Sequence, residues 1–360
     1  MTSIVSVATA TSALPLPAPL RLGAMTVTRR EYSAVRATDA HGNTGHAYCL
    51  SREAPMAQIV DRLIAPHALG ADADDPGAAW ERMLRGSAIV GRVGLVRRAI
   101  GLVDIAMWDI AARRAGQPLW RLLGVGDAPR PSMLVAAYPT PDRTPGEVAD
   151  EVLEQAAGWT TVKISRSPDP AYMRELIARI TRDLPTGTGL VVDVGFGWRD
   201  ADEALAEIVQ WGDPELAWLE DPLLPEDVAG CARIRRETGM RLSVGDEVTD
   251  PAVLRALVEQ DAVDVLRLDV VAIGGVTPAL DLISWARERG VPVSGHVYPE
   301  VTAHLGIGVE TFAREGNPYD PSPSLIRGGP LFTGTVRPTA APGLGFGFVE
   351  SVFEFERGMG

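Results

Sequence analysis

The chain has 360 residues, 46% of them hydrophobic, and a formal net charge of −13. This length suffices for a large domain plus a smaller one, while the acidic balance argues against nucleic acid and anionic membranes as partners, since both attract basic surfaces. No segment approaches the roughly 18 consecutive apolar residues of a membrane span. Cys49 and Cys231 lack a metal-ligand spacing, and no basic residue precedes Arg21 as in a secretory signal, so we expect a reduced, cytoplasmic protein.

Residues 1–126 predict an α+β domain. The alternation in residues 4–7 is typical of a strand, and the proline-rich residues 15–23 are expected to form a loop. Two further strand patterns, at 32–38 and 45–50, flank a turn-forming segment and predict a hairpin.

A long helical pattern follows at residues 99–124. Its apolar residues recur at helical spacing, and Gly116 and Gly124 fit helix-ending positions. We interpret this segment as structural packing rather than as part of a catalytic site.

Residues 127–318 predict a (β/α) barrel. Short apolar segments there each end in a polar residue, and these polar residues recur 23 to 30 positions apart, which fits one strand, one helix and two loops. Asp250 and Thr277, each followed by proline, are expected as N-caps of two of the helices. Short buried strands that alternate with helices form a parallel sheet, and enough of them close into a barrel. The tail, residues 319–360, is expected to return to the first domain.

In such a barrel the polar residues at the strand ends meet at one mouth, where the chemistry takes place. These residues are Lys163, Asp193, Glu220, Asp246, Asp269 and His296. The three carboxylates Asp193, Glu220 and Asp246 repel one another unless a cation lies among them, and hard oxygen ligands suit Mg²⁺. The alternative is that they cap helices or pair with arginines. Glu247 competes with Asp246 for the third ligand position, although strand alternation lets only one of the two face inward.

Asp269 and His296 follow the next two strands. A carboxylate beside an imidazole fixes its tautomer and makes the neutral ring a better base, so His296 is a candidate general base. The other histidines lack such partners in the pattern and are expected to be structural or solvated. Lys163 would lie beside the cation, which should lower its pKa.

These residues resemble the enolase superfamily, and its mandelate racemase group in particular. The motifs that carry the resemblance are Val192-Asp193, Trp218-Leu-Glu220-Asp-Pro222, Gly245-Asp246-Glu247, Leu268-Asp269 with Gly274-Gly275-Val276, and Ser294-Gly295-His296. The likeness covers nearly the whole chain. It implies a (β/α)7β modified TIM barrel with an N-terminal α+β capping domain that the C-terminal tail completes.

The resemblance also implies roles for individual residues. Those expected to bind Mg²⁺ are Asp193, Glu220 and Asp246. The pair formed by Asp269 and His296 would be the base. Glu315, near the end of a weak eighth strand, would hydrogen-bond the substrate carboxylate, with Glu310 as its rival.

The chain departs from the family pattern at the second barrel strand. Where the group typically has Lys-x-Lys, this sequence has Lys163-Ile-Ser165, so the second lysine, the base on the opposite face, is missing. Asp246 is shorter than the Glu common in the racemase group. Asp269 stands where other groups carry a lysine, which favours the histidine-based chemistry.

The common step in this family is removal of the proton α to a carboxylate, which gives an enediolate. His296 serves one face of it, whereas Ser165 is a poor base, so elimination, which needs only one abstraction, is favoured. We therefore expect an acid-sugar dehydratase that forms a 2-keto-3-deoxy acid. The alternatives are a racemase or epimerase of a 2-hydroxy acid with Lys163 as second base, a Schiff-base aldolase through Lys163, and a non-catalytic acid-binding protein.

The expected partner is a small carboxylate substrate, with no nucleic acid or membrane partner, and the chain is expected to form a homo-oligomer. The sequence does not specify the acid, because specificity should come from loops over the mouth, at residues 15–28 and 49–56. Arg21 and Arg52 could pair with a distal carboxylate, but solvent exposure is the expected state of both.

Overall fold

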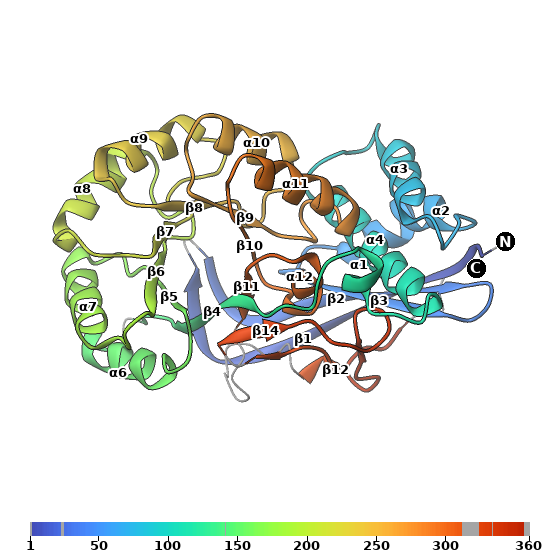
Figure 1. Cartoon of the computed structure of the whole chain (residues 1–360), viewed down its shortest axis with the longest axis horizontal. Helices are drawn as coiled ribbons and strands as arrows, with labels where there is room; N and C mark the ends of the chain where they lie inside the picture. The colour runs from blue at the N-terminus through green and yellow to red at the C-terminus, as the bar shows by residue number, and fades with distance from the viewer. Residues whose placement is uncertain (1, 23–24, 141, 312–323, 333, 356–360) are drawn as a thin grey trace.

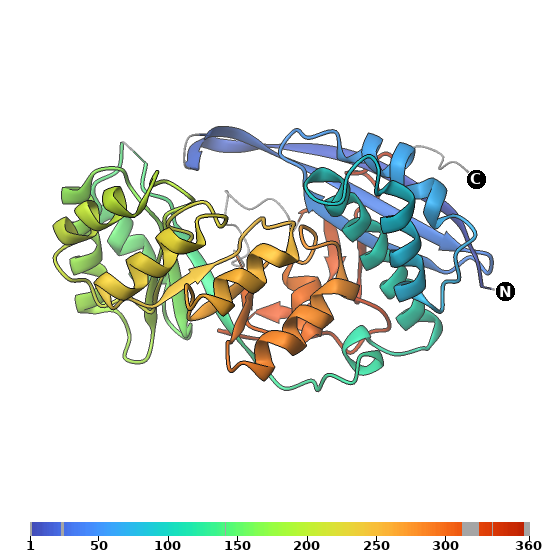
Figure 2. The ribbon, with the colours of Figure 1, turned by 90° about the horizontal axis from the view of Figure 1, so that it is seen from above.

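The computed structural model describes residues 2–22, 25–140, 142–311, 324–332 and 334–355. The capping domain begins with an antiparallel sheet of order β1-β2-β3, formed by β1 (Ile4–Leu22), β2 (Met25–Asp39) and β3 (Thr44–Leu50). The loop expected at residues 15–23 is wrong for residues 15–22, which continue β1. The prolines there are tolerated because β1 is an edge strand whose pairing with β2 is interrupted between Pro15 and Leu20. Figure 2 shows β1 and β2 reaching from the capping domain toward the barrel.

Helices cover this sheet on one side. They are α1 (Met56–Ile59), the π-helical turn η1 (Val60–Ile64), α2 (Ala65–Ala68), α3 (Pro76–Ser87), α4 (Leu95–Arg114) and α5 (Leu119–Leu122). The helix α4 packs against β3, and a Cβ atom at Gly45 would lie 1.9 Å from the backbone oxygen of Ala106, so only glycine allows this close approach. Most of α4 is buried, as its apolar spacing predicts.

The barrel consists of eight parallel strands surrounded by helices (Figure 1). The strands are β4 (Arg130–Ala137), β5 (Thr161–Ser165), β6 (Gly189–Asp193), β7 (Trp218–Glu220), β8 (Leu242–Val244), β9 (Val265–Leu268), β10 (Val293–Gly295) and β11 (Val309–Thr311). The helices are α6 (Pro145–Gln155), α7 (Pro170–Asp183), α8 (Ala201–Trp211), α9 (Val228–Thr238), α10 (Pro251–Glu259), α11 (Val276–Glu288), α12 (Pro299–Thr302) and the 3-10 turn η2 (Ala303–Leu305). The strands follow one another in sequence order from β4 to β10, and β11 pairs with β4 to nearly close the ring. The expected fold class is confirmed.

A buried aspartate of the capping domain joins α4 to the barrel helix α11. Asp104 accepts hydrogen bonds from the backbone nitrogen of Thr277 at 2.9 Å and from its hydroxyl at 2.6 Å, and Trp108 donates to the same hydroxyl at 2.9 Å. Burial raises the pKa of Asp104 to about 7.

The helix α11 begins at Val276, so the expected N-cap at Thr277 is wrong, whereas Asp250 caps α10 through the nitrogen of Ala252.

The C-terminal segment contacts both domains through β12 (Ile326–Gly328), β13 (Leu331–Phe332), β14 (Thr335–Arg337) and β15 (Phe346–Phe348). The strand β14 pairs with β4 of the barrel, while β15 lies against β3, with the rings of Phe346 and Tyr48 centred 6.1 Å apart. The domain boundaries at residues 126 and 318 remain predictions. Within the described ranges, no helix has both the length and the apolar character needed to cross a bilayer.

Candidate active site

A cavity of about 350 Å³ opens at the C-terminal ends of the barrel strands. The capping domain contributes Arg30, Leu50 and Arg52 to its lining. Of the six strand-end residues expected there, Lys163, Asp193, Asp246 and His296 line it, while the buried Glu220 and Asp269 contact Lys163 and His296. The convergence expected from the strand-end spacing is therefore observed.

Three carboxylates meet at the base of this cavity. One oxygen from each of Asp193, Glu220 and Asp246 can be chosen so that all lie within 4.8 Å of one another, close enough to share a metal ion. Gly195 donates its N–H to Asp193 Oδ1 and Trp218 donates its indole N–H to Glu220 Oε2, both at 2.9 Å, which orients these carboxylates. An all-oxygen set of this kind fits a hard divalent cation such as Mg²⁺.

Glu247 faces away from this triad. Its backbone lies at φ 63°, and its carboxylate forms ion pairs with Arg52 of the capping domain and Arg98 of α4. Burial opposes the charge of Glu247, but the two guanidinium groups outweigh it and lower the pKa to about 2. Arg52 is solvent-exposed, as expected, while its guanidinium group also pairs with Glu247 at the cavity wall; the side chain of Arg21 lies outside the described part.

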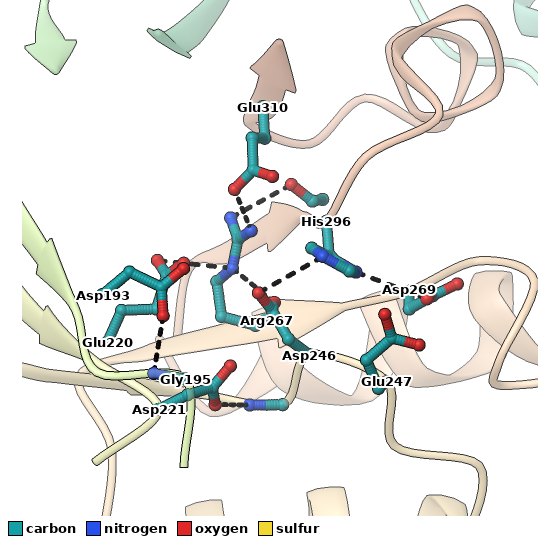
Figure 3. A network of polar contacts seen from close by, with 12 residues as sticks. Asp193, Gly195, Glu220, Asp221, Asp246, Glu247, Arg267, Asp269, His296 and Glu310 are labelled. Carbon is teal, nitrogen blue, oxygen red and sulfur yellow. Dashed lines mark hydrogen bonds and ion pairs between the residues drawn. The ribbon is translucent and has the colours of Figure 1, made fainter. Parts of the chain in front are cut away.

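Asp269 and His296 form the expected pair. His296 Nδ1 lies 3.3 Å from Asp269 Oδ2, while Nε2 lies 3.5 Å from Asp246 Oδ2 (Figure 3). Asp269 is fixed through its other oxygen, which accepts backbone N–H groups of Val271 at 2.9 Å and Ala272 at 2.8 Å. Burial opposes the imidazolium, but Asp246 and the hydrogen bond to Asp269 outweigh it and raise the pKa of His296 to about 9.

These residues also contain a second group with metal-ligand spacing, formed by Glu247, Asp269 and His296. Arg98 lies between the two carboxylates, ion-paired with Glu247 and with its Nη1 3.7 Å from Asp269 Oδ2. This group mixes an imidazole with two carboxylates, whereas Asp193, Glu220 and Asp246 form the all-oxygen set that suits Mg²⁺ better.

Lys163 is buried among carboxylates. Its Nζ lies 2.6 Å from Glu220 Oε1, 2.6 Å from Glu310 Oε2 and 3.2 Å from Asp193 Oδ2. Burial opposes its charge, yet these three carboxylates outweigh burial and raise the pKa of Lys163 well above its usual value. The expected lowering depends on a cation beside Lys163 and stays a prediction, since this raised pKa reflects the protein groups alone.

Two residues complete the site in ways that the sequence analysis ranked second or missed. Glu310, at β11, accepts hydrogen bonds from Lys163 and from Arg267, whereas Glu315 lies outside the described residues. Arg267 was not singled out, although a charged residue in the apolar strand β9 is the signal that could have revealed it. Figure 3 shows its guanidinium group between Glu310 and Asp246.

Comparison with known proteins gives a consistent family. Residues 4–124 match the mandelate racemase / muconate lactonizing enzyme N-terminal domain, and residues 147–352 match the enolase C-terminal domain-like family. The chain is 29% identical over 281 residues to 3,6-anhydro-alpha-L-galactonate cycloisomerase of Streptomyces coelicolor, covering 76% of each chain. It is 28% identical over 278 residues to L-talarate/galactarate dehydratase of Salmonella typhimurium, covering 75% of this chain and 68% of the relative.

Solved structures share the whole fold. L-Talarate dehydratase from Polaromonas sp. JS666, complexed with Mg and L-glucarate, superposes with a TM-score of 0.87 at 24% identity over 100% of both chains. A racemase from Streptomyces coelicolor A3(2) with bound magnesium superposes with a TM-score of 0.86 at 24% identity, covering 98% of this chain and 100% of that one.

Proposed function

Because the chain belongs to the mandelate racemase/muconate lactonizing enzyme family of the enolase superfamily, we propose that it abstracts the proton α to a carboxylate and dehydrates an acid sugar to a 2-keto-3-deoxy acid. Dehydratases of acid sugars are among its relatives, including those for L-talarate/galactarate, L-galactonate and L-rhamnonate. The substrate would occupy the cavity between the capping domain and the strand ends.

The residues that would hold Mg²⁺ are Asp193, Glu220 and Asp246. When bound, the ion supplies positive charge where negative charge develops on the substrate carboxylate, which is worth several kcal/mol of stabilisation. Lys163 would contact the same end of the substrate as a fixed cation, and Glu310 would hold Lys163 and Arg267 in place there.

The observation that carries the proposal is the one-sided arrangement of bases. His296, held by Asp269, faces the triad, while the described cavity lining has Ser165 where a second lysine would be needed. Lys163 is tied to Glu220, Glu310 and Asp193 at the metal end of the cavity, so it would face the substrate carboxylate rather than the α-proton. The same ion pairs disfavour the Schiff-base alternative, since they hold the ammonium form, whereas a Schiff-base lysine must be neutral to attack a carbonyl.

Dehydration needs only the single base. His296 takes the α-proton at Nε2, the bond between the β-carbon and its hydroxyl oxygen breaks, and the imidazolium returns a proton to the departing oxygen, which leaves as water. The resulting enol then tautomerises to the 2-keto acid. No oxidant or second protein base is required.

The test is a screen of acid sugars, both aldonic and diacid, for formation of a 2-keto acid by the purified protein with Mg²⁺. We expect at least one to be dehydrated, with activity lost in EDTA and restored by Mg²⁺. Racemisation of a 2-hydroxy acid with no dehydration of any sugar would favour the racemase alternative. A metal-independent activity would contradict the proposal.

A further inference from the structure

Arg267 is a charged side chain at the centre of the barrel. It lies on β9 between Leu266 and Leu268, and strand alternation turns it to the opposite face from theirs, toward Asp246 and Glu310. Its side chain is 0% exposed, so it cannot reach a substrate in the cavity. It therefore can act on the chemistry only through the residues that it touches.

All three guanidinium nitrogens of Arg267 donate to oxygen atoms. Nε donates to Asp246 Oδ1 at 2.8 Å, and Nη2 donates to Glu310 Oε2. Nη1 donates to Ser294 Oγ and to the backbone oxygen of Gly295, both at 3.0 Å. The planar group is thus anchored on β10 at one end and contacts three carboxylates of the site, since Nε also lies 3.5 Å from Glu220 Oε2.

The contact with Asp246 separates the roles of its two oxygens. Oδ1 is taken by Arg267, whereas Oδ2 lies on the side of His296, 3.5 Å from Nε2. Because an Asp side chain has only two torsions, fixing one oxygen also fixes the direction of the other. The guanidinium group therefore determines where Asp246 presents its remaining oxygen.

We propose that Arg267 is a positioning residue that aims the Asp246 carboxylate at the metal ion. The inference rests on the proposed metal site at Asp193, Glu220 and Asp246. It explains why the buried Arg267 accompanies the short side chain of Asp246. The long arginine side chain reaches from β9 to Asp246 and supplies the hydrogen bond that keeps its carboxylate oriented.

Charge and positioning predict opposite effects when Arg267 is removed. Loss of a cation close to a metal site should, by charge alone, strengthen binding of a divalent ion. Loss of the hydrogen bond that orients a ligand should weaken it, by 10- to 100-fold where such outer partners have been removed from metal sites. The direction of the change therefore separates the two effects.

The experiment measures Mn²⁺ affinity of the full-length protein by electron paramagnetic resonance of the free ion, without substrate. Arg267→Met removes the charge and the hydrogen bonds at similar volume, and Arg267→Lys keeps the charge but loses the planar fork. We expect both variants to bind Mn²⁺ about 10- to 100-fold more weakly than the wild type. Tighter Mn²⁺ binding by Arg267→Met, with the affinity of Arg267→Lys unchanged, would show that only charge matters and would overturn the proposal. Wild-type affinity in both variants would also overturn it.

Two controls keep the outcomes distinct. Asp246→Asn tests the metal site itself, and undiminished Mn²⁺ binding by that variant would refute the proposed ligand set rather than the role of Arg267. Thermal unfolding without metal reports whether each variant folds. If Arg267→Met does not fold because the buried carboxylates around it lose a cation, Arg267→Lys, which retains a cation for them, decides the question alone.

Discussion

Asp246 and Glu247 are neighbours in the chain, yet their carboxylates lie in different charge networks. Asp246 accepts a hydrogen bond from Arg267 in the barrel interior and belongs to the triad with Asp193 and Glu220. Glu247 is held by Arg52 and Arg98 from the capping domain. One residue thus faces the proposed ion, while the next joins the two domains at the mouth.

This division predicts different losses for two matched substitutions. Asp246→Asn should reduce metal affinity and activity by at least 100-fold, since an amide is a poor replacement for an ionised ligand. Glu247→Gln should keep metal binding near that of the wild type and weaken only the contact with the capping domain. Calorimetric Mg²⁺ titration and a dehydration assay check both, and the reverse pattern would move the third ligand to Glu247.

The pairing of His296 with Asp269 predicts an ordered loss of proton abstraction. His296→Asn should abolish exchange of the substrate α-proton into D₂O, because no other described group on that side is placed to take it. Asp269→Asn should slow exchange by roughly 10²- to 10⁴-fold, since the imidazole loses its orienting partner. NMR of the substrate in D₂O measures both rates, and retained exchange in His296→Asn would make Lys163 the base.

The features that the sequence predicted depend on local patterns. The lengths of strands and helices depend on residues that are close in the sequence. Because the strand ends of a barrel meet at one mouth, Lys163, Asp246 and His296 could be placed together there. The identity of their partners is not local. The pKa of Lys163 is raised by Glu220, Glu310 and Asp193, and Glu310 lies 147 positions away in the chain.

The errors have the same physical origin. Thr277 resembles an N-cap by its own sequence, but the helix is capped by Asp104, 173 positions earlier. The prolines of residues 15–22 predict a loop when this segment is considered alone, but β2 pairs with both ends of the segment and makes it part of a strand. Arg267 looks like an isolated charge in a strand, because its carboxylate partners come from β8 and β11.

Glu310 and Glu315 can be separated by a matched pair of substitutions. Burial opposes the charge of Glu310, but Lys163 and Arg267 outweigh it and hold its pKa far below the usual value. Glu310→Gln should therefore leave two buried cations undercompensated and destabilise the protein by about 3–5 kcal/mol, besides lowering kcat/KM. Glu315→Gln serves as the comparison and should change neither the urea midpoint nor kcat/KM greatly. If only Glu315→Gln lowers kcat/KM, Glu315 rather than Glu310 is the acidic group at the substrate carboxylate.

The Asp104 carboxyl predicts a pH-dependent contribution to stability. Its folded pKa of about 7 exceeds the ordinary 3.8, so the folded state binds the proton more tightly, and stability from this group falls as pH rises toward 7. Asp104→Asn cannot ionise, so its stability relative to the wild type should rise by about 2–3 kcal/mol between pH 5 and pH 8. Urea unfolding at both pH values measures this difference, with the exposed Asp281→Asn on α11 as control; a difference that does not change with pH would contradict it.

Ser165 and His296 reach the cavity from different sides of the barrel. Ser165 ends β5 and His296 follows β10, with β11 and β4 between those strands. Both side chains line the cavity. An intermediate held there would therefore meet an imidazole from one direction and a hydroxyl, a poor proton donor and base, from the other.

This arrangement predicts the stereochemistry of the reaction. A 2-hydroxy acid without a β-hydroxyl should exchange its α-proton for deuterium with retention of configuration, because the proton returns from the side that it left. An acid sugar with a β-hydroxyl should lose water instead, since elimination removes the intermediate through a step that His296 can complete. Label uptake by NMR and optical rotation are followed together for a mandelate-like acid and for a panel of acid sugars.

The control is Ser165→Lys, which should add a second base and introduce racemisation. Racemisation by the wild type at a rate comparable to exchange, with no keto acid from any sugar, would refute the dehydratase proposal and make Lys163 a working second base.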